Sequence, residues 1–409
     1  MAGSTEPPAM NPPTPVPKIV RRRNLTPVYV AVAIVVIAGI VVAAGFQAGW
    51  FSAKSPSGPG TSLHACPTGI TLSGAGANIV NTLVTAWAPA FNTATGDQVS
   101  YNPAGSGTGV TDLQSAQVDF AASDAPLNST QTAGFPDPVL TLPVTAGALT
   151  VIYTLPGITS PVQLTGSVLA GIFNGSITNW NATPISSINP SLRLPSATII
   201  PIVRSDGAGT TYVLTDFLSQ DNSPWASSVG KGLTVAFPHV SGEEAVKGNA
   251  LEVSTVQKTS YAIGYSDLTD TLGTSGLQYA KIQNPSGNYI LPDLANTASA
   301  IADKAGATAF PASTASWASV SMVNAAGTSD YPLATLIYFY IYQDGGHGYS
   351  PTSVAKSQVV RDWLNWTITT GQSLSNELYY VTLPSGLVSI DQAGLGTLSY
   401  NGAPIPACG

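Results

Sequence analysis

The sequence predicts an α/β fold with parallel sheets, because short β-branched runs alternate with helix-like stretches along most of the chain. The composition supports a folded protein, since 44% of the 409 residues are hydrophobic and only 9% are charged. Such a chain buries a core and fits neither a disordered protein nor a coiled coil. Its length indicates two domains or lobes.

The N-terminus predicts a disordered tail followed by a membrane anchor. Residues 1–27 are rich in proline and include three consecutive arginines, Arg21 to Arg23. Residues 28–50 carry no charge and are long enough to cross about 30 Å of hydrocarbon. The arginines precede this transmembrane helix, so the positive-inside rule places the tail in the cytoplasm and the rest outside. A cleaved secretion signal is the alternative.

Residues 51–63 are rich in Ser, Pro and Gly, and we expect them to form a linker between the membrane anchor and the folded extracellular part. Beyond residue 53, 10 Lys and Arg face 20 Asp and Glu, a net charge of −10 that argues against a nucleic-acid partner. An acidic medium or a glycosylated surface would explain why uncharged polar residues dominate. We expect Cys66 and Cys408 to form a disulfide, because this compartment permits one; two free thiols are the alternative.

The folded part contains runs that predict individual strands and helices. The β-branched runs predict strands over residues 69–73, 99–102, 149–153, 198–203 and 261–265. Amphipathic stretches predict helices over residues 78–93, 110–116, 210–219 and 353–370. Because the two kinds of element alternate, we expect parallel pairing of the strands.

Three glycine-containing loops each connect a predicted strand to a predicted helix, at residues 73–78, 104–109 and 204–211. In an open parallel sheet a ligand binds at the carboxyl ends of the strands. Glycine lets backbone N–H groups approach an anion at a helix N-terminus. If the three loops converge, they form an oxyanion site, whereas each loop alone fits an ordinary turn. None matches the phosphate loop of nucleotide-binding proteins.

Two charged residues lie in or near these loops. Arg204, one of three arginines beyond the predicted anchor, begins the third loop, and its guanidinium suits bidentate capture of an oxyanion. Asp124 follows an apolar strand-like segment. As a carboxylate it accepts a hydrogen bond from a protonated anion and repels sulfate, which has no proton near neutral pH. A salt-bridging arginine and a capping aspartate are the alternatives.

No catalytic or metal site is predicted. His64, His239 and His347 lie apart from the loops and lack the spacing of metal ligands, and no nucleophile-elbow motif is present. We therefore expect a binding protein without a cofactor rather than an enzyme.

Several motifs resemble, in order and spacing, those of the phosphate-binding subunit of the high-affinity phosphate ABC transporter. They are GAGANIV from Gly74, GSGTGV from Gly105, VDFAASDAPL from Val118, LTGSVLAGIFNGSITNWN from Leu164, INPSLRLP from Ile188, VRSDGAGTTYVLTDFLS from Val203, AIGY from Ala262 and LPSGL from Leu383. The resemblance implies a type II periplasmic-binding-protein fold with a ligand cleft between two lobes. Residues 64–145 and 330–409 would form lobe 1, and residues 146–329 lobe 2.

The resemblance also implies a set of site residues. The expected phosphate ligands are Asn78, Ile79, Ser106, Asp124, Arg204, Ala208, Gly209 and Thr210, with Ala77 and Asp206 in support. Asp124 corresponds to the carboxylate that accepts the phosphate proton, and Arg204 to the guanidinium that Asp206 orients. At Asn78 and Ala208 the chain departs from the family pattern, which usually has Thr and Ser there.

The function implied is extracellular binding of inorganic phosphate by a monomer and its delivery to the permease subunits of an ABC transporter. Two other classes stay open. One is binding of a different oxyanion, such as arsenate or sulfate. The other is a phosphatase-like or purely structural cell-surface protein.

Overall fold

The computed structural model describes residues 67–238, 240–346 and 351–407. The predicted tail, membrane anchor and linker lie outside the described residues, and so do both cysteines and all three histidines. Within the part that is described, no helix is long and apolar enough to cross a membrane.

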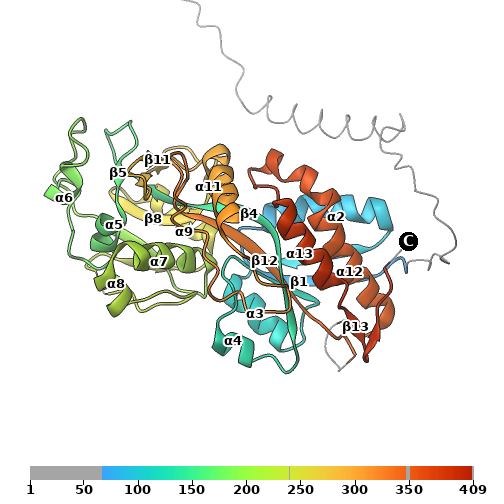
Figure 1. Cartoon of the computed structure of the whole chain (residues 1–409). Helices are drawn as coiled ribbons and strands as arrows, with labels where there is room; N and C mark the ends of the chain where they lie inside the picture. Colours follow the sequence, from blue (N-terminus) through green and yellow to red (C-terminus); the bar gives the residue numbers. More distant parts are fainter. Residues whose placement is uncertain (1–66, 239, 347–350, 408–409) are drawn as a thin grey trace, which may run out of the picture. The chain divides into compact units, whose positions relative to one another are not determined.

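Helices and strands alternate along the described chain (Figure 1). The strands are β1 Thr71–Gly76, β2 Gln98–Asn102, β3 Phe120–Ser123, β4 Val139–Tyr153, β5 Gln163–Leu164, β6 Ile200–Arg204, β7 Glu244–Val246, β8 Ala262–Asp267, β9 Gln278–Tyr279, β10 Lys281–Gln283, β11 Tyr289–Ile290, β12 Ala334–Tyr342, β13 Ser399–Tyr400 and β14 Ala403–Pro404. The helices are α2 Asn81–Thr95, α3 Ser106–Gln114, α4 Ser129–Ala133, α5 Gly166–Phe173, α6 Thr183–Ser186, α7 Gly209–Asp221, α8 Ser223–Ser228, α9 Asn249–Lys258, α10 Leu268–Thr271, α11 Leu294–Ala307, α12 Val354–Ile368, α13 Ser385–Leu395 and the 3-10 helices η1 Thr370–Leu374 and η2 Asn376–Leu378.

A nine-stranded mixed sheet has the order β2-β1-β3-β12-β4-β8-β6-β7, with β9 beside β4. The strands β2, β1 and β3 pair in parallel at one end, and β8, β6 and β7 do so at the other. Between them β12 and β4 are antiparallel to each other and to their outer neighbours. The prediction of parallel sheets is right for both ends and wrong for the middle. There β4 runs from one half of the sheet into the other, and β12 returns beside it in the opposite direction.

Strand β4 is 15 residues long and contributes to both halves of the sheet. Its first part pairs with β12, and its last residues, Leu149 to Tyr153, pair with β8. The register with β12 shifts between Pro143 and Thr145, which leaves Val144 as an extra residue. Pro143 has no N–H group to donate and fits a position beside such a bulge. A bulge bends a strand and increases its twist.

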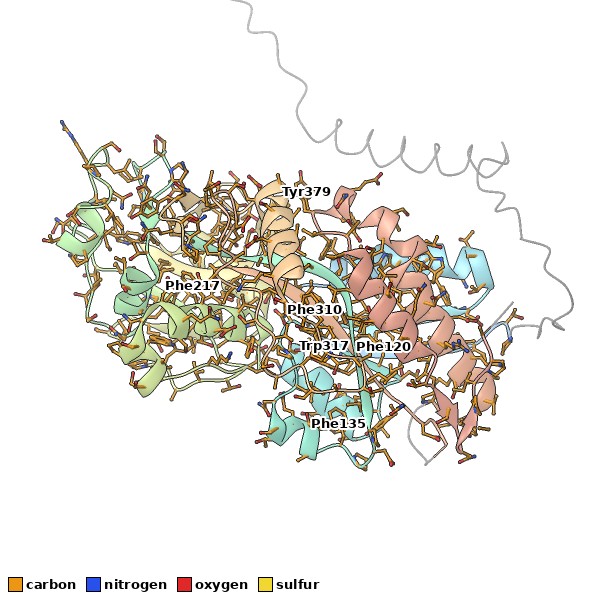
Figure 2. All side chains as sticks on the ribbon, in the orientation of Figure 1. Phe120, Phe135, Phe217, Phe310, Trp317 and Tyr379 are labelled. Atoms are coloured by element: carbon orange, nitrogen blue, oxygen red, sulfur yellow. The ribbon has the colours of Figure 1, made fainter. Side chains whose placement is uncertain are left out.

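The buried apolar residues form two large clusters, one on each half of the sheet. Figure 2 labels Phe120, which belongs to the first cluster, and Phe217, which belongs to the second. Ile301 and Trp317 also pack in the first cluster, although the lobe boundaries implied by the sequence motifs place them in lobe 2. The site described below draws residues from both halves.

Helix α2 shows how the sequence positions the first cluster. Leu83, Trp87 and Phe91 recur every four residues and are all buried, as one face of an amphipathic helix should be. The helix ends at Gly96, whose φ of 84° lies in the left-handed region that glycine adopts without strain. The predicted helix is therefore present, but it begins at Asn81, after a turn.

All predicted strands and helices of the folded part occur, with shifted ends. Helices α3 and α7 begin earlier than predicted, at Ser106 and Gly209, because the last residues of the predicted loops already belong to the helices. Strand β1 runs through the first predicted loop as far as Gly76, since it pairs there with β3. A Cβ on Gly76 would lie 2.1 Å from the carbonyl oxygen of Ala122, so only glycine permits this approach.

Candidate functional site

A small, tightly packed pocket lies where the carboxyl ends of several sheet strands meet. Its lining consists of Asn78, Gly105, Ser106, Asp124, Arg204, Ala208, Gly209, Thr210, Asn249 and Asp267. The three glycine-containing loops therefore meet at one place. Three of the expected site residues, Ala77, Ile79 and Asp206, do not line the pocket; Asp206 instead contacts Arg204 from outside it.

Three helices begin at this pocket without a hydrogen bond from a capping side chain. Helix α3 follows Gly105, α7 follows Ala208 and α9 follows Gly248. The first N–H groups of a helix have no partner within the helix and carry a partial positive charge. Such N-termini favour an anion in the pocket between them.

Arg204 is the last residue of β6, and only 1% of its side chain is exposed. Its Nε and Nη2 donate to Oδ1 and Oδ2 of Asp206 at 2.8 and 2.6 Å. Its Nη1 donates to Oγ1 of Thr210 at 3.2 Å and to Oδ1 of Asn249. Burial raises the pKa of Asp206, but the hydrogen bonds and charge of Arg204 outweigh burial and lower it overall. Asp206 is thus an ionised partner that fixes the guanidinium.

Asp124 follows β3 and faces the first turn of α7. Its Oδ1 accepts a hydrogen bond from Oγ of Ser106 at 2.6 Å. The carboxyl group lies so close to α7 that a Cβ added to Gly209 would be 1.3 Å from this Oδ1. Burial raises the pKa of Asp124, and the hydrogen bond from Ser106 opposes that rise. Burial in the pocket therefore favours the protonated form of this carboxyl group.

A further group of polar residues beside Arg204 was not predicted from the sequence. Oδ1 of Asn249 accepts from Arg204 and, at 3.4 Å, from Nδ2 of Asn78. Nδ2 of Asn249 donates to Oδ2 of Asp267 and, at 2.7 Å, to Oδ2 of Asp270. The available signals are a glycine–asparagine pair at a helix start and an acidic residue two positions after AIGY, at the end of β8.

Glu252 lies behind the guanidinium, away from the pocket, and is completely buried. Its Oε2 is 4.0 Å from Nη1 of Arg204, and its Oε1 accepts from the N–H of Tyr265 at 3.2 Å. Burial raises the pKa of Glu252 to about 8, although the charge of Arg204 opposes the rise. Between about pH 4.5 and about pH 8, Glu252 is therefore protonated in the folded protein and ionised in the unfolded chain.

We expect the protein to lose stability as pH rises through this window, and Glu252→Gln to reduce the loss. Glutamine keeps the shape of the protonated side chain and does not ionise. Denaturant unfolding at about pH 5 and about pH 8 measures the effect, with a smaller fall in the free energy of unfolding expected for the variant. An equal fall in both proteins would contradict the buried, protonated state of Glu252.

A larger cavity lies elsewhere in the fold, between the turn before β4 and residues 314–317, and it contains none of the expected site residues. Phe135 and Trp317, both labelled in Figure 2, are part of its wall. Among the residues that the structure describes, no group of three His, Cys, Asp or Glu side chains is arranged to hold a metal ion.

The chain is similar to known proteins over most of its length. A model of the PBP superfamily domain matches residues 60–370. A phosphate-binding protein PstS from Xylella fastidiosa (strain 9a5c) is 32% identical over 327 residues, which cover 78% of this chain and 83% of that protein. One from Methanocaldococcus jannaschii is 30% identical over 303 residues, covering 72% and 77%. The solved structure of a phosphate-binding protein from Stenotrophomonas maltophilia has a TM-score of 0.59 at 21% identity and covers 79% of this chain and 93% of its own.

Proposed function

The chain belongs to the family of phosphate-binding proteins PstS, within the PBP superfamily, and on this basis we propose that its pocket binds inorganic phosphate. The main support for the proposal is that Ser106, Asp124 and Arg204 line the same pocket. A hydroxyl, a carboxyl and a guanidinium are the groups that a protonated tetrahedral anion needs around it. The family is one of binding proteins, in agreement with the expectation that the chain is not an enzyme.

In this proposal the anion accepts hydrogen bonds from Arg204, Thr210 and the N–H groups at the starts of α3 and α7, including the N–H of Ser106, whose hydroxyl donates to Asp124. Asp124 accepts the phosphate proton. The departures from the family pattern affect two ligands: Asn78 supplies an amide in place of a hydroxyl, and Ala208 supplies only its backbone.

Ala77 and Ile79 support the first loop from outside the pocket. Their carbonyl oxygens accept hydrogen bonds from the hydroxyls of Tyr101, at 2.7 Å, and Tyr380, respectively. The role proposed for Ile79 in binding is therefore limited to its backbone N–H group.

We further infer that the protein works outside the cytoplasm as a type II receptor whose two lobes, residues 64–145 with 330–409 and residues 146–329, close over phosphate. Closure would then present the loaded form to the permease of an ABC transporter. A hydrogen bond of 2.9 Å from the N–H of Gly107 to the carbonyl of Gly207 supports closure, because it links the second and third loops. The membrane anchor at residues 28–50, the Cys66–Cys408 disulfide and the monomeric state complete the proposal and rest on the sequence.

We expect the full-length chain to bind phosphate and to exclude sulfate, because sulfate has no proton to place against Asp124. Isothermal titration with phosphate in the absence and presence of sulfate tests this. Asp124→Asn removes the repelling carboxylate and should improve sulfate binding relative to phosphate by about tenfold or more.

A matched control is Asp391→Asn, which replaces a completely buried acid on α13 outside the pocket. The control should keep the selectivity of the wild type. If the wild-type chain failed to bind phosphate, or if sulfate displaced phosphate equally well, the proposed function would be wrong.

A further inference from the structure

We propose that Asp267 is a second carboxyl group in contact with the bound anion, so that the complex holds two protons and selects the dihydrogen form of phosphate. The inference rests on the proposed function, since it concerns the same pocket. It assigns to Asp267 a specificity role alongside that of Asp124.

The position of Asp267 at the end of β8 brings its carboxyl group to the pocket. The residue lines the pocket together with Asp124 and is only 1% exposed. Its Oδ2 accepts from Nδ2 of Asn249, whereas its buried Oδ1 has no hydrogen-bond partner. Burying a polar oxygen without a partner costs free energy, and a ligand that supplies a hydrogen bond removes that cost.

Helix capping does not explain this residue. Asp267 precedes α10 at the N-cap position, yet its side chain accepts no hydrogen bond from the helix. By contrast, Asp293 at the start of α11 accepts a hydrogen bond from the N–H of Asn296 at 2.7 Å. The carboxyl group of Asp267 instead contacts Asn249, which also contacts Arg204.

The charges around Asp267 are predominantly acidic. The titratable groups that interact with it electrostatically are Asp124 after β3, Arg204 on β6, Asp270 on α10 and Tyr380 after η2. Arg204 is the only cation in this set and is already paired with Asp206. Burial, and then the charges of Asp124 and Asp270, raise the pKa of Asp267 well above its usual value. A phosphate dianion would meet net repulsion here unless protons accompanied it.

The number of protons in the complex follows from the two carboxyl contacts. A carboxyl oxygen and a phosphate oxygen attract each other only when one proton lies between them, whichever of the two carries it. Contacts at Asp124 and Asp267 therefore require two protons. The complex is equivalent to dihydrogen phosphate held by two carboxylates, and a monohydrogen phosphate ion brings one proton too few.

The test is the pH dependence of phosphate affinity, measured by calorimetry on the full-length chain in detergent between about pH 6 and about pH 10. At the alkaline end, where both carboxyl groups of the free protein are ionised, wild-type affinity should fall about tenfold per pH unit. In Asp267→Asn the amide donates its own N–H to the phosphate oxygen. Its complex needs only the proton that phosphate brings, so its affinity should become nearly independent of pH there.

The control Asp391→Asn should keep the wild-type slope, because its buried acid lies outside the pocket. Asp267→Ser, which also removes the carboxyl group, provides the comparison if Asp267→Asn does not fold. Parallel slopes for the wild type and the position-267 variant would overturn the inference and leave the proposed function intact. Absence of phosphate binding by the wild type at every pH would instead overturn the proposed function.

Discussion

Replacing Arg204 with alanine should remove most of the phosphate affinity, by about 2–5 kcal/mol. The guanidinium is the only cation among the residues that line the pocket, and its geometry is fixed by Asp206, Thr210 and Asn249. Its loss would also leave the partly buried Asp206 without its ion-pair partner. Because a partly buried carboxylate would lose its charged hydrogen-bond donors, we expect the free energy of unfolding to fall by about 1–3 kcal/mol.

Calorimetry with phosphate and denaturant unfolding measure the two effects separately. Arg204→Lys keeps the charge but loses the planar fork that pairs with Asp206, so an intermediate affinity is expected. Arg193→Ala is the matched control, because Arg193 is exposed and does not line the pocket. Near-normal phosphate affinity in Arg204→Ala would show that the site is assigned wrongly.

Gly209→Ala should weaken phosphate binding by about tenfold to a hundredfold while the protein stays folded. The added methyl group would lie 1.3 Å from Oδ1 and 1.9 Å from Cγ of Asp124, so the carboxyl group would have to rotate away. The rotation would break the hydrogen bond from Ser106 and move the proposed proton acceptor out of position.

The matched control for this glycine is Gly386→Ala, near the start of α13. A Cβ on Gly386 meets no atom within 4 Å, so this change should leave phosphate affinity unaltered and stabilise the fold by about 0.5–1 kcal/mol. Titration calorimetry and thermal unfolding of both variants provide the comparison. Wild-type affinity in Gly209→Ala would mean that the carboxyl group of Asp124 does not need its present position.

The sequence predicted the pocket residues that lie in or beside a recognisable local motif. Ser106 and Gly209 lie in glycine-containing segments between a strand and a helix, and Arg204 is a rare charge at the start of one of them. Asn249 and Asp267 have no comparable local signal. The contact of Asn249 with the guanidinium, and that of Asp267 with Asn249, depend on the pairing of β6 with β7 and β8, which brings together residues far apart in the chain.

The antiparallel middle of the sheet was missed for a related reason. Strands β4 and β12 are almost entirely buried, and a continuous apolar run predicts a buried strand without indicating its direction. The crossing topology depends on which strands flank them. The neighbours of a strand are determined by pairing between distant parts of the chain, so local periodicity carries no information about strand direction.

The continuity of β4 also limits how the pocket opens. Strand β4 is hydrogen-bonded in both halves of the sheet. A rotation of one half against the other would therefore bend this strand, because no flexible linker stands in its place. The extra residue Val144 beside Pro143 interrupts the hydrogen bonding between β4 and β12, so we expect β4 to bend most easily at this point. If the two halves rotate as proposed, we therefore expect the motion to be small and to be taken up by bending of β4 near Val144.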